Sequence, residues 1–224
     1  MRDDLLPSLK GRLIVSCQAY PGEPLRDPDA MRRMALAVLE GGAAGIRAQG
    51  LRDLWAIRGA TDAPLIGLWK DGASGVFITP TAMHAREVAR TGADIVALDA
   101  TARPRPDGRP LAESIEAVHA EGRLVMADVA TEAEGVRAAE LGADLVGTTL
   151  SGYTDDSPKT PGPDLGLVER LARTLDVPVV AEGRIHTPDQ AAAALAAGAY
   201  AVVVGTAITH PTTLTRWFAR AVQA

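Results

Sequence analysis

Two ionisable side chains stand at the ends of apolar segments that are typical of buried strands. The run Leu65-Ile-Gly-Leu-Trp69 is followed by Lys70, and the run Val177-Pro-Val-Val-Ala181 is followed by Glu182. An amine and a carboxyl group that are partly removed from water can act as base and acid, because burial disfavours the charged form of each. A lysine in such a place can also attack a carbonyl group. These two residues are therefore candidates for the reacting groups of an enzyme.

Each candidate also has a plainer interpretation. Lys70 precedes Asp71-Gly72 and could be a solvated lysine in a turn. A glutamate after four apolar residues is costly to bury unless it is paired, and Glu182 could form a salt bridge with the nearby Arg184. The sequence does not decide between these interpretations.

Other polar side chains occupy similar positions. Gln18 follows the first apolar segment, and Arg47 lies inside the second, where an arginine needs an anionic or hydrogen-bonding partner. We expect a functional role for Arg47. Asp128 and Asp99 each end an apolar segment, and Asp128 could instead lie in the N-cap region of the helix that begins near Thr131.

Glycine turns follow the last two apolar segments, at Gly183 and at Gly205-Thr206. Barrels often bind phosphate at these positions with loop N–H groups and a short extra helix, for which residues 206–209 are a candidate. The sequence has no G-x-G-x-x-G or Walker A motif, and its four histidines lack metal-ligand spacing. We expect neither a metal nor a nucleotide cofactor, and we expect His84 and His119 to be solvated on helices.

Apolar segments alternate with helical patterns along the whole chain. The predicted strands cover residues 13–17, 45–48, 64–69, 94–98, 124–127, 144–148, 177–181 and 201–204. The predicted helices cover residues 28–40, 51–59, 81–91, 110–121, 132–141, 164–175, 188–197 and 213–222. Eight such pairs predict a closed (β/α)8 barrel, an α/β fold of the TIM type, as a single domain over residues 1–224. A doubly wound open sheet would give a similar alternation.

Composition limits the partners of the chain. The net charge is −5 and no basic run exceeds Arg32-Arg33, so nucleic acid is not an expected partner. Cys17 is the only cysteine, and no apolar stretch reaches the length of a membrane span. Residues 1–7 lack the apolar segment of a signal peptide. We expect a soluble cytoplasmic protein without membrane contact, and a homodimer.

Several motifs resemble the N-acetylmannosamine-6-phosphate 2-epimerase family. They are Ser16-Cys-Gln-Ala19, Gly45-Ile-Arg-Ala48, Ile78-Thr-Pro-Thr81, Ala97-Leu-Asp-Ala-Thr101, Arg103-Pro-Arg-Pro-Asp-Gly108, Gly147-Thr-Thr-Leu-Ser-Gly-Tyr-Thr154, Ala181-Glu-Gly-Arg184 and Val202-Val-Val-Gly205. The resemblance covers nearly the whole chain. It implies a cofactor-free isomerase that interconverts N-acetyl-D-mannosamine 6-phosphate and N-acetyl-D-glucosamine 6-phosphate in sialic acid catabolism.

The resemblance also implies roles for individual residues. In that family, the lysine after strand three and the glutamate after strand seven are the proposed catalytic pair, and they match Lys70 and Glu182. The implied sugar contacts are Gln18, Arg47, Asp128, Thr149, Tyr153 and Arg184. The implied phosphate contacts are Gly183, Gly205, Thr206 and His210.

Two positions depart from the family pattern. Members commonly carry Lys-Arg/Lys-x-Tyr after strand three, where this chain has Lys70-Asp71-Gly72-Ala73. The phosphate-contacting arginine of an I-T-R-P motif is His210 here. Because imidazole binds an anion best when protonated, we expect the KM to rise between about pH 6 and 8. Alternatively, His210 is solvated and Arg184 or backbone N–H groups hold the phosphate.

The chemistry expected from the resemblance is proton removal and return at C2 of an open-chain sugar, with Lys70 as base and Glu182 as acid. Two other functions would fit the same barrel. A Schiff-base lyase would use Lys70 as nucleophile, and a non-catalytic sensor would bind the sugar phosphate without exchange at C2.

Overall fold

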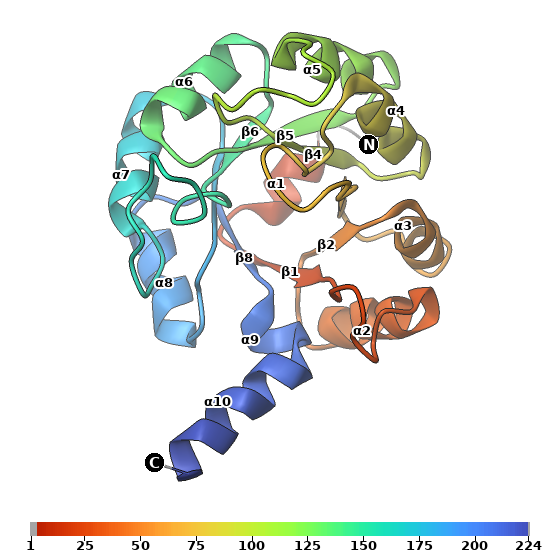
Figure 1. Cartoon of the computed structure of the whole chain (residues 1–224), viewed down its shortest axis with the longest axis vertical. Helices are drawn as coiled ribbons and strands as arrows, with labels where there is room; N and C mark the ends of the chain where they lie inside the picture. Colours follow the sequence, from red (N-terminus) through yellow and green to blue (C-terminus); the bar gives the residue numbers. More distant parts are fainter. Residues whose placement is uncertain (1–3, 224) are drawn as a thin grey trace.

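Eight parallel strands form a closed ring in the computed structural model, which describes residues 4–223 (Figure 1). Each strand pairs with the next along the chain, and the last pairs with the first, with Ile14 opposite Val203. The strands are β1 (Leu13–Cys17), β2 (Gly45–Gln49), β3 (Leu65–Leu68), β4 (Ile95–Asp99), β5 (Leu124–Asp128), β6 (Leu145–Gly147), β7 (Val179–Glu182) and β8 (Ala201–Val204). The predicted (β/α)8 barrel is confirmed. Closure of the ring excludes the open doubly wound sheet.

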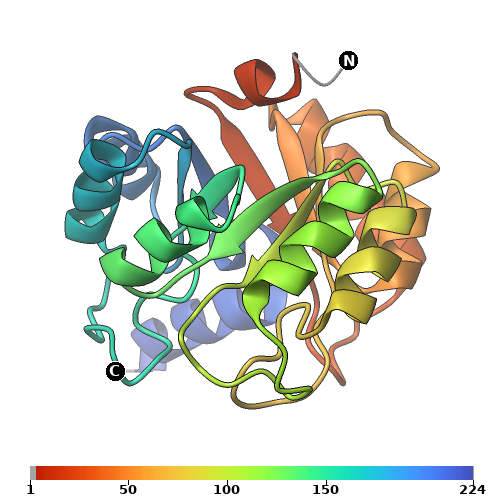
Figure 2. The same ribbon diagram turned by 90° about the horizontal axis from the view of Figure 1, so that it is seen from above.

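Helices surround the ring (Figures 1 and 2). They are α1 (Leu5–Leu9), α2 (Pro28–Glu40), α3 (Leu51–Arg58), α4 (Ala82–Arg90), α5 (Leu111–Ala120), α6 (Glu132–Glu140), α7 (Leu165–Thr174), α8 (Pro188–Ala196), α9 (Thr206–Thr209) and α10 (Pro211–Gln223). The eight predicted helices and the short helix at 206–209 are present. Residues 1–3 and 224 of the predicted domain lie outside the described residues.

Side chains alternate along every strand between the barrel interior and the helix layer. Ile14, Ile66, Ile95 and Met126 belong to one buried cluster inside the ring. Their chain neighbours, such as Val15 and Val96, pack against the helices instead. Residues at the strand ends inherit this alternation, so it determines which polar side chains point inward.

Side-chain caps fix the starts of several helices just after the β→α loops. Thr131 and Glu134 form a capping box at the start of α6, and Thr187 and Gln190 form another at α8. The alternative that placed Asp128 in the N-cap region of α6 is therefore wrong. The cap of α6 is Thr131, and Asp128 points inward.

Helices α1 and α10 lie at the two ends of the chain. Helix α1 was not predicted. It lies at the end of the barrel opposite the long β→α loops (Figure 2) and buries Leu9. Helix α10 begins at Pro211 and extends away from the barrel (Figure 1). It has no buried residue, and Phe218 is 73% exposed.

Gly67 marks the place where helices α3 and α4 approach β3 most closely. A Cβ atom there would lie 2.8 Å from Ala93 Cβ, 2.9 Å from Val88 Cγ1 and 3.1 Å from Leu54 Cδ1. We predict that Gly67→Ala lowers the free energy of unfolding by about 1–3 kcal/mol, because the core must shift to admit the methyl group. Urea unfolding followed by circular dichroism measures this change.

Gly162→Ala is the matched control. Its added Cβ would meet only Gln190 Nε2, at 3.4 Å. We expect a change within about 0.5 kcal/mol. Equal stability of the two variants would contradict the close packing of α3 and α4 on β3.

Candidate active site

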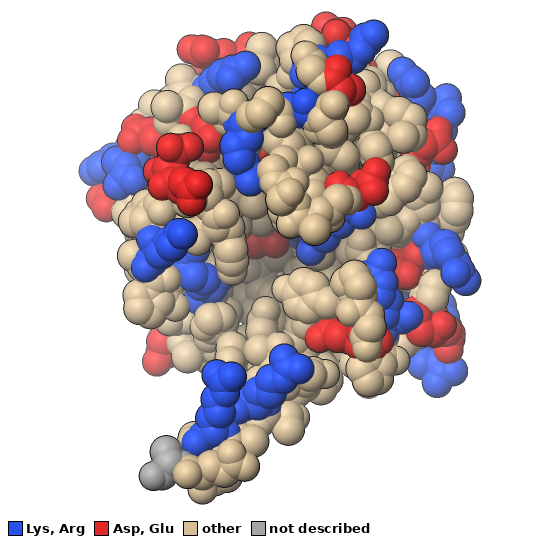
Figure 3. Space-filling model, viewed as in Figure 1, with Lys and Arg blue, Asp and Glu red and all other residues tan. Residues whose placement is uncertain are grey.

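A pocket of about 520 Å³ opens at the carboxyl ends of the strands. Its size suits a small organic ligand. Figure 3 looks into this hollow, with acidic atoms visible at its floor. The loops after β3 and β6 both contribute to it, through Lys70, Gly72, Phe77 and Tyr153 among others. The lining also includes Gln18, Thr149, Glu182, Gly183, Arg184, Gly205, Thr206 and His210.

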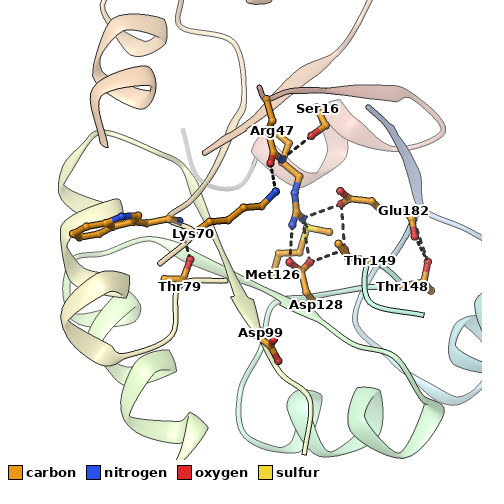
Figure 4. Close-up of polar contacts among 12 residues, drawn as sticks. Ser16, Arg47, Lys70, Thr79, Asp99, Met126, Asp128, Thr148, Thr149 and Glu182 are labelled. Atoms are coloured by element: carbon orange, nitrogen blue, oxygen red, sulfur yellow. Dashed lines mark hydrogen bonds and ion pairs between the residues drawn. The ribbon is translucent and has the colours of Figure 1, made fainter. Parts of the chain in front are cut away.

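Arg47 lies beneath the floor of this pocket and is 1% exposed. Its Nη2 donates to Asp128 Oδ2 at 2.6 Å and its Nη1 donates to Asp128 Oδ1 at 3.1 Å (Figure 4). Nη1 also lies 2.9 Å from Glu182 Oε2. The anionic partner expected for Arg47 is therefore present twice. Neither Arg47 nor Asp128 lines the pocket, so Glu182 and Thr149 separate them from it.

Glu182 is the carboxyl group of this cluster that reaches the pocket. Burial raises its pKa to about 7, Arg47 opposes the rise, and the nearby Asp128 carboxylate adds to it. The Thr149 hydroxyl lies 3.2 Å from Glu182 Oε2 and 2.7 Å from Asp128 Oδ1. The suggested salt bridge between Glu182 and Arg184 is wrong, because Arg47 is the ionic partner of Glu182.

Arg47 itself is held in its charged form. Burial works against the charge, but Asp128 and Glu182 outweigh it and keep the pKa of Arg47 above its ordinary value. One guanidinium thus faces two carboxyl groups inside the barrel. Asp128 receives two hydrogen bonds from it and Glu182 receives one ionic contact, so Glu182 is the less neutralised of the two.

Lys70 enters the pocket from the opposite side of the floor. Its Nζ donates to Gln18 Oε1 at 2.7 Å and lies 5.7 Å from the centre of the Tyr20 ring. Burial lowers the pKa of Lys70 to about 8, and the positive charge of Arg47 contributes to the shift. The interpretation of Lys70 as a freely solvated turn residue does not fit this environment.

The loop after β3 folds back on itself to present Lys70. Lys70 forms an antiparallel bridge with Ile78, and Thr79 N–H donates to the Trp69 carbonyl at 2.7 Å. Thr79 is fully buried with a φ of 46°, a backbone conformation that is rare for a β-branched residue. Its hydroxyl accepts from Trp69 N–H at 3.1 Å.

The expected phosphate contacts gather at the β7 and β8 side of the pocket. Gly183 has a φ of +113° and leads away from β7, and Gly205 is the N-cap residue of α9. Gly183, Gly205 and Thr206 each have a backbone N–H group at this side of the pocket. Among the backbone hydrogen bonds of loops, turns and caps in residues 4–223, none is donated by these three groups. These amides are therefore available to an anionic ligand in the pocket.

His210 stands beside these amides and is buried. Its ring lies 5.0 Å from the Tyr20 ring and its Nδ1 lies 3.8 Å from Glu23 Oε2. Burial lowers the pKa of His210, Glu23 opposes the change, and Lys70 adds to it. The suggestion that His210 is solvated is wrong.

Arg184 is engaged by the loop after β6. Its Nε donates to the Gly162 carbonyl at 2.8 Å, its Nη1 donates to the Ser151 carbonyl, and its guanidinium lies 5.7 Å from the Tyr153 ring. Tyr153 is 62% exposed at the rim of the pocket. Arg184 thus fastens this loop over the pocket while lining the pocket itself.

Sequence reasoning missed several residues that line the pocket, among them Ser16, Tyr20, Arg26, Gln49, Arg103 and His186. Arg103 is fixed there by Asp99, with Nη2 2.7 Å from Asp99 Oδ2. The alternation along β1 and β2 could have identified Ser16 and Gln49 as inward-facing. No comparable signal exists for the loop residues Tyr20 and Arg26.

The expectation that His84 is solvated is also wrong. His84 is 5% exposed and contacts Trp69 and Asp71 beneath the Lys70 loop. His119 is the exposed histidine of the two, and its Nε2 lies 2.9 Å from Asp144 Oδ2. The described residues contain no group of three His, Cys, Asp or Glu side chains that could hold a metal ion. None of their helices is long and apolar enough to cross a membrane.

Comparison with known proteins identifies the relatives of this chain. Residues 31–224 match the model of the family described as "Putative N-acetylmannosamine-6-phosphate epimerase". A relative from Cutibacterium acnes, described as "Putative N-acetylmannosamine-6-phosphate 2-epimerase", is 57% identical over 219 residues, which is 96% of each chain. A relative of the same description from Clostridioides difficile is 46% identical over 221 residues, covering 98% of this chain and 99% of the relative.

A solved structure gives the same result. The N-acetylmannosamine-6-phosphate 2-epimerase from Clostridium perfringens superposes with a TM-score of 0.94 at 46% identity, covering 96% of this chain and 95% of that one. Thiamine phosphate pyrophosphorylase from Pyrococcus furiosus, at 24% identity and a TM-score of 0.63, shares the fold. The family match, the relatives and the superposition together show that this chain belongs to the N-acetylmannosamine-6-phosphate 2-epimerase family.

Proposed function

We propose that this protein interconverts N-acetyl-D-mannosamine 6-phosphate and N-acetyl-D-glucosamine 6-phosphate by removing and returning the proton at C2. Family membership supports the substrate. The observation that carries the mechanism is the pair of groups at one pocket, Lys70 with a pKa lowered to about 8 and Glu182 with a pKa raised to about 7. Such a pair can serve as base and acid near neutral pH.

The reaction begins when the sugar ring opens and C1 becomes an aldehyde. The C2 proton is then α to a carbonyl group. The neutral amine of Lys70 takes this proton, the C–H electron pair forms the C1–C2 double bond, and Glu182 gives its proton to O1. Return of a proton to the other face of C2, with the carbonyl restored, completes the epimerisation. No electron is gained or lost overall.

The remaining residues would hold the substrate. Gln18, Thr149, Tyr153 and Arg184 line the pocket and are proposed sugar contacts. The N–H groups of Gly183, Gly205 and Thr206 are proposed to bind the phosphate, with His210 beside them. Because Arg47 and Asp128 lie below the floor, we propose that they act on the substrate by positioning Glu182.

Proton NMR of N-acetylmannosamine 6-phosphate in D₂O tests the proposal. We predict that deuterium enters C2 as gluco signals appear. Lys70→Ala should slow both changes by roughly 10²–10⁴-fold, and Glu182→Gln should slow turnover while substrate still binds. Trapping of a covalent adduct by borohydride would instead indicate a Schiff-base lyase. Binding by the wild type without exchange at C2 would indicate a sensor.

The two shifted groups also predict the pH dependence. Activity requires Lys70 neutral, which is favoured above about pH 8, and Glu182 protonated, which is favoured below about pH 7. The product of the two fractions peaks between these values, so kcat/KM should be bell-shaped with its maximum between about pH 7 and 8. A profile that is flat from about pH 5.5 to 9, after correction for the substrate phosphate, would contradict this assignment.

His210→Arg tests the proposed phosphate contact. Burial lowers the pKa of His210 from its ordinary value of 6.5. The imidazolium form therefore loses its proton at a lower pH than that of an exposed histidine. The KM of the wild type should therefore rise at a lower pH than the sequence alone indicated. A permanent guanidinium should lower the KM at pH 7.5 by about tenfold and remove the pH dependence. His119→Arg, on the exposed face of α5, is the control, and identical KM profiles for wild type and His210→Arg would discard the contact.

We further propose that the protein is a homodimer that forms through α10. Leu214, Trp217, Phe218 and Val222 share one helix face, and the last three are exposed. An exposed apolar face on a helix that has no buried residue is typical of a contact with a second protein. Sedimentation velocity should show a dimer that Phe218→Glu converts to a monomer, with Arg216→Glu as control. A wild-type monomer at micromolar concentration would refute this proposal.

A cytoplasmic location is also proposed. The single cysteine fits a reducing compartment. The charged phosphate ester proposed as substrate does not cross a membrane without a carrier, which places its conversion in the compartment where it is formed.

A further inference from the structure

A histidine–aspartate pair joins the loop that carries Lys70 to the first turn of helix α4. Asp71, the next residue after Lys70, has its Oδ2 3.1 Å from His84 Nε2. His84 Nδ1 lies 2.7 Å from the hydroxyl of Thr81, the N-cap residue of α4. Both ring nitrogens of His84 are therefore used, one toward the loop and one toward the start of the helix.

The pair fastens the loop to a rigid element. His84 belongs to the first turn of α4 and is 5% exposed, whereas the Asp71 side chain is 64% exposed. The Trp69 ring packs edge-on against the His84 ring, with 4.5 Å between the centres. His84 thus contacts the residues on both sides of Lys70, one by packing and the other by a hydrogen bond.

We propose that His84 and Asp71 are positioning residues that aim Lys70 at the substrate, an inference that rests on the proposed role of Lys70 as the base. A lysine side chain has four rotatable methylene groups and adopts many conformations when its backbone is free. Here two contacts fix the backbone of Lys70 to the returning arm of the same loop. They are the Lys70–Ile78 bridge and the bond from Asp71 N–H to the Phe77 carbonyl at 3.0 Å.

These backbone contacts hold the two arms of the loop together. The Ile78 arm is attached to β4, because Asp99 N–H donates to the Ile78 carbonyl at 3.0 Å. The Lys70 arm is attached to the helix layer at α4. The His84–Asp71 bond supplies this attachment at the residue next to Lys70. Successive side chains of an extended segment point to opposite sides, so a tether on Asp71 turns Lys70 toward Gln18 and the pocket. Loss of the tether should leave the loop folded and its direction less well defined.

The alternative is that His84 only fills space under Trp69. Four variants separate the two roles. His84→Phe keeps an aromatic ring and removes the donor, whereas His84→Gln keeps a donor and removes the ring. Asp71→Ala removes the same bond from the exposed side, where folding is not at risk, and Asp71→Asn keeps an acceptor while removing the charge.

The chain offers a matched control in His119→Phe. His119 and Asp144 form a similar pair, with 2.9 Å between Nε2 and Oδ2, on α5 and before β6, and neither residue lines the pocket. This variant should leave kcat unchanged. It measures what loss of a histidine–aspartate bond does by itself.

The experiment measures kcat and KM for epimerisation, with Lys70→Ala as the reference for loss of the base. We expect His84→Phe and Asp71→Ala each to lower kcat about tenfold or more with KM within about twofold, because misplacement of a reacting group by a fraction of an ångström slows chemistry more than binding. His84→Gln and Asp71→Asn should stay near wild type. The double variant should be no slower than the slower single variant, because both remove one interaction.

The possible failures are distinguishable. If Lys70→Ala retains activity, the proposed function of Lys70 fails and this inference fails with it. If Lys70→Ala is inactive while Asp71→Ala keeps the wild-type kcat, the proposed function stands and the positioning role is overturned. A loss in His84→Gln that neither His84→Phe nor Asp71→Ala shares would overturn the positioning role and assign His84 to packing alone.

Discussion

One buried guanidinium that faces two carboxyl groups sets the chemistry of this barrel. Arg47 is almost fully buried and contacts both Asp128 and Glu182. Removing three ionisable groups from water is costly, and one positive charge cannot fully compensate two negative charges. Burial, with a smaller contribution from the Asp128 carboxylate, raises the pKa of Glu182 to about 7, although Arg47 opposes the rise. The same positive charge contributes to the lowered pKa of Lys70 across the pocket. Burial thus brings Glu182 toward its neutral form against the charge of Arg47, whereas burial and Arg47 together bring Lys70 toward its neutral form.

The barrel makes this cluster possible because it joins strands that are distant in sequence. Arg47 is on β2, Asp128 on β5 and Glu182 on β7, and closure of the ring directs all three into its centre (Figure 4). Strand register places Asp128 opposite Asp99 and Gly147. A Cβ atom at Gly147 would lie 2.3 Å from Met126 and 3.3 Å from Asp128 Oδ1, so glycine there leaves room for the cluster. The fold and the pKa shifts thus have a common cause in the packing of the interior.

Much of this arrangement could be predicted from the sequence. Continuous apolar runs identify the eight strands, and an arginine within such a run predicts a buried anionic partner, which the structure supplies in Asp128. The alternation of side chains along each strand also predicts which polar residues face the barrel interior. Asp128 and Glu182 each lie two residues after an interior apolar side chain, Met126 and Val180. Arg47 lies between Ile46 and Ala48, which pack toward the helices. This count predicts that all three point inward.

The remaining features depend on contacts that no local pattern encodes. The pairing of Glu182 with Arg47, in place of the adjacent Arg184, requires knowledge of which strands face each other across the ring. His84 looks like a surface residue of α4 until the Lys70 loop folds over it. Arg103 reaches the pocket because Asp99 holds it there, a contact between a strand end and the following loop. Helix α10 has an ordinary amphipathic pattern, and only the three-dimensional structure shows that it buries none of its residues.

The protonation of Glu182 is the measurement closest to the centre of this account. Protein labelled with ¹³C at the glutamate carboxyl carbon can be titrated by NMR, and the resonance absent from Glu182→Gln identifies this residue. The account predicts a titration midpoint near pH 7, in line with a buried carboxyl group that shares Arg47 with Asp128. A midpoint near the ordinary value of 4.5 would contradict it, because Glu182 would then be ionised at neutral pH and unable to donate a proton.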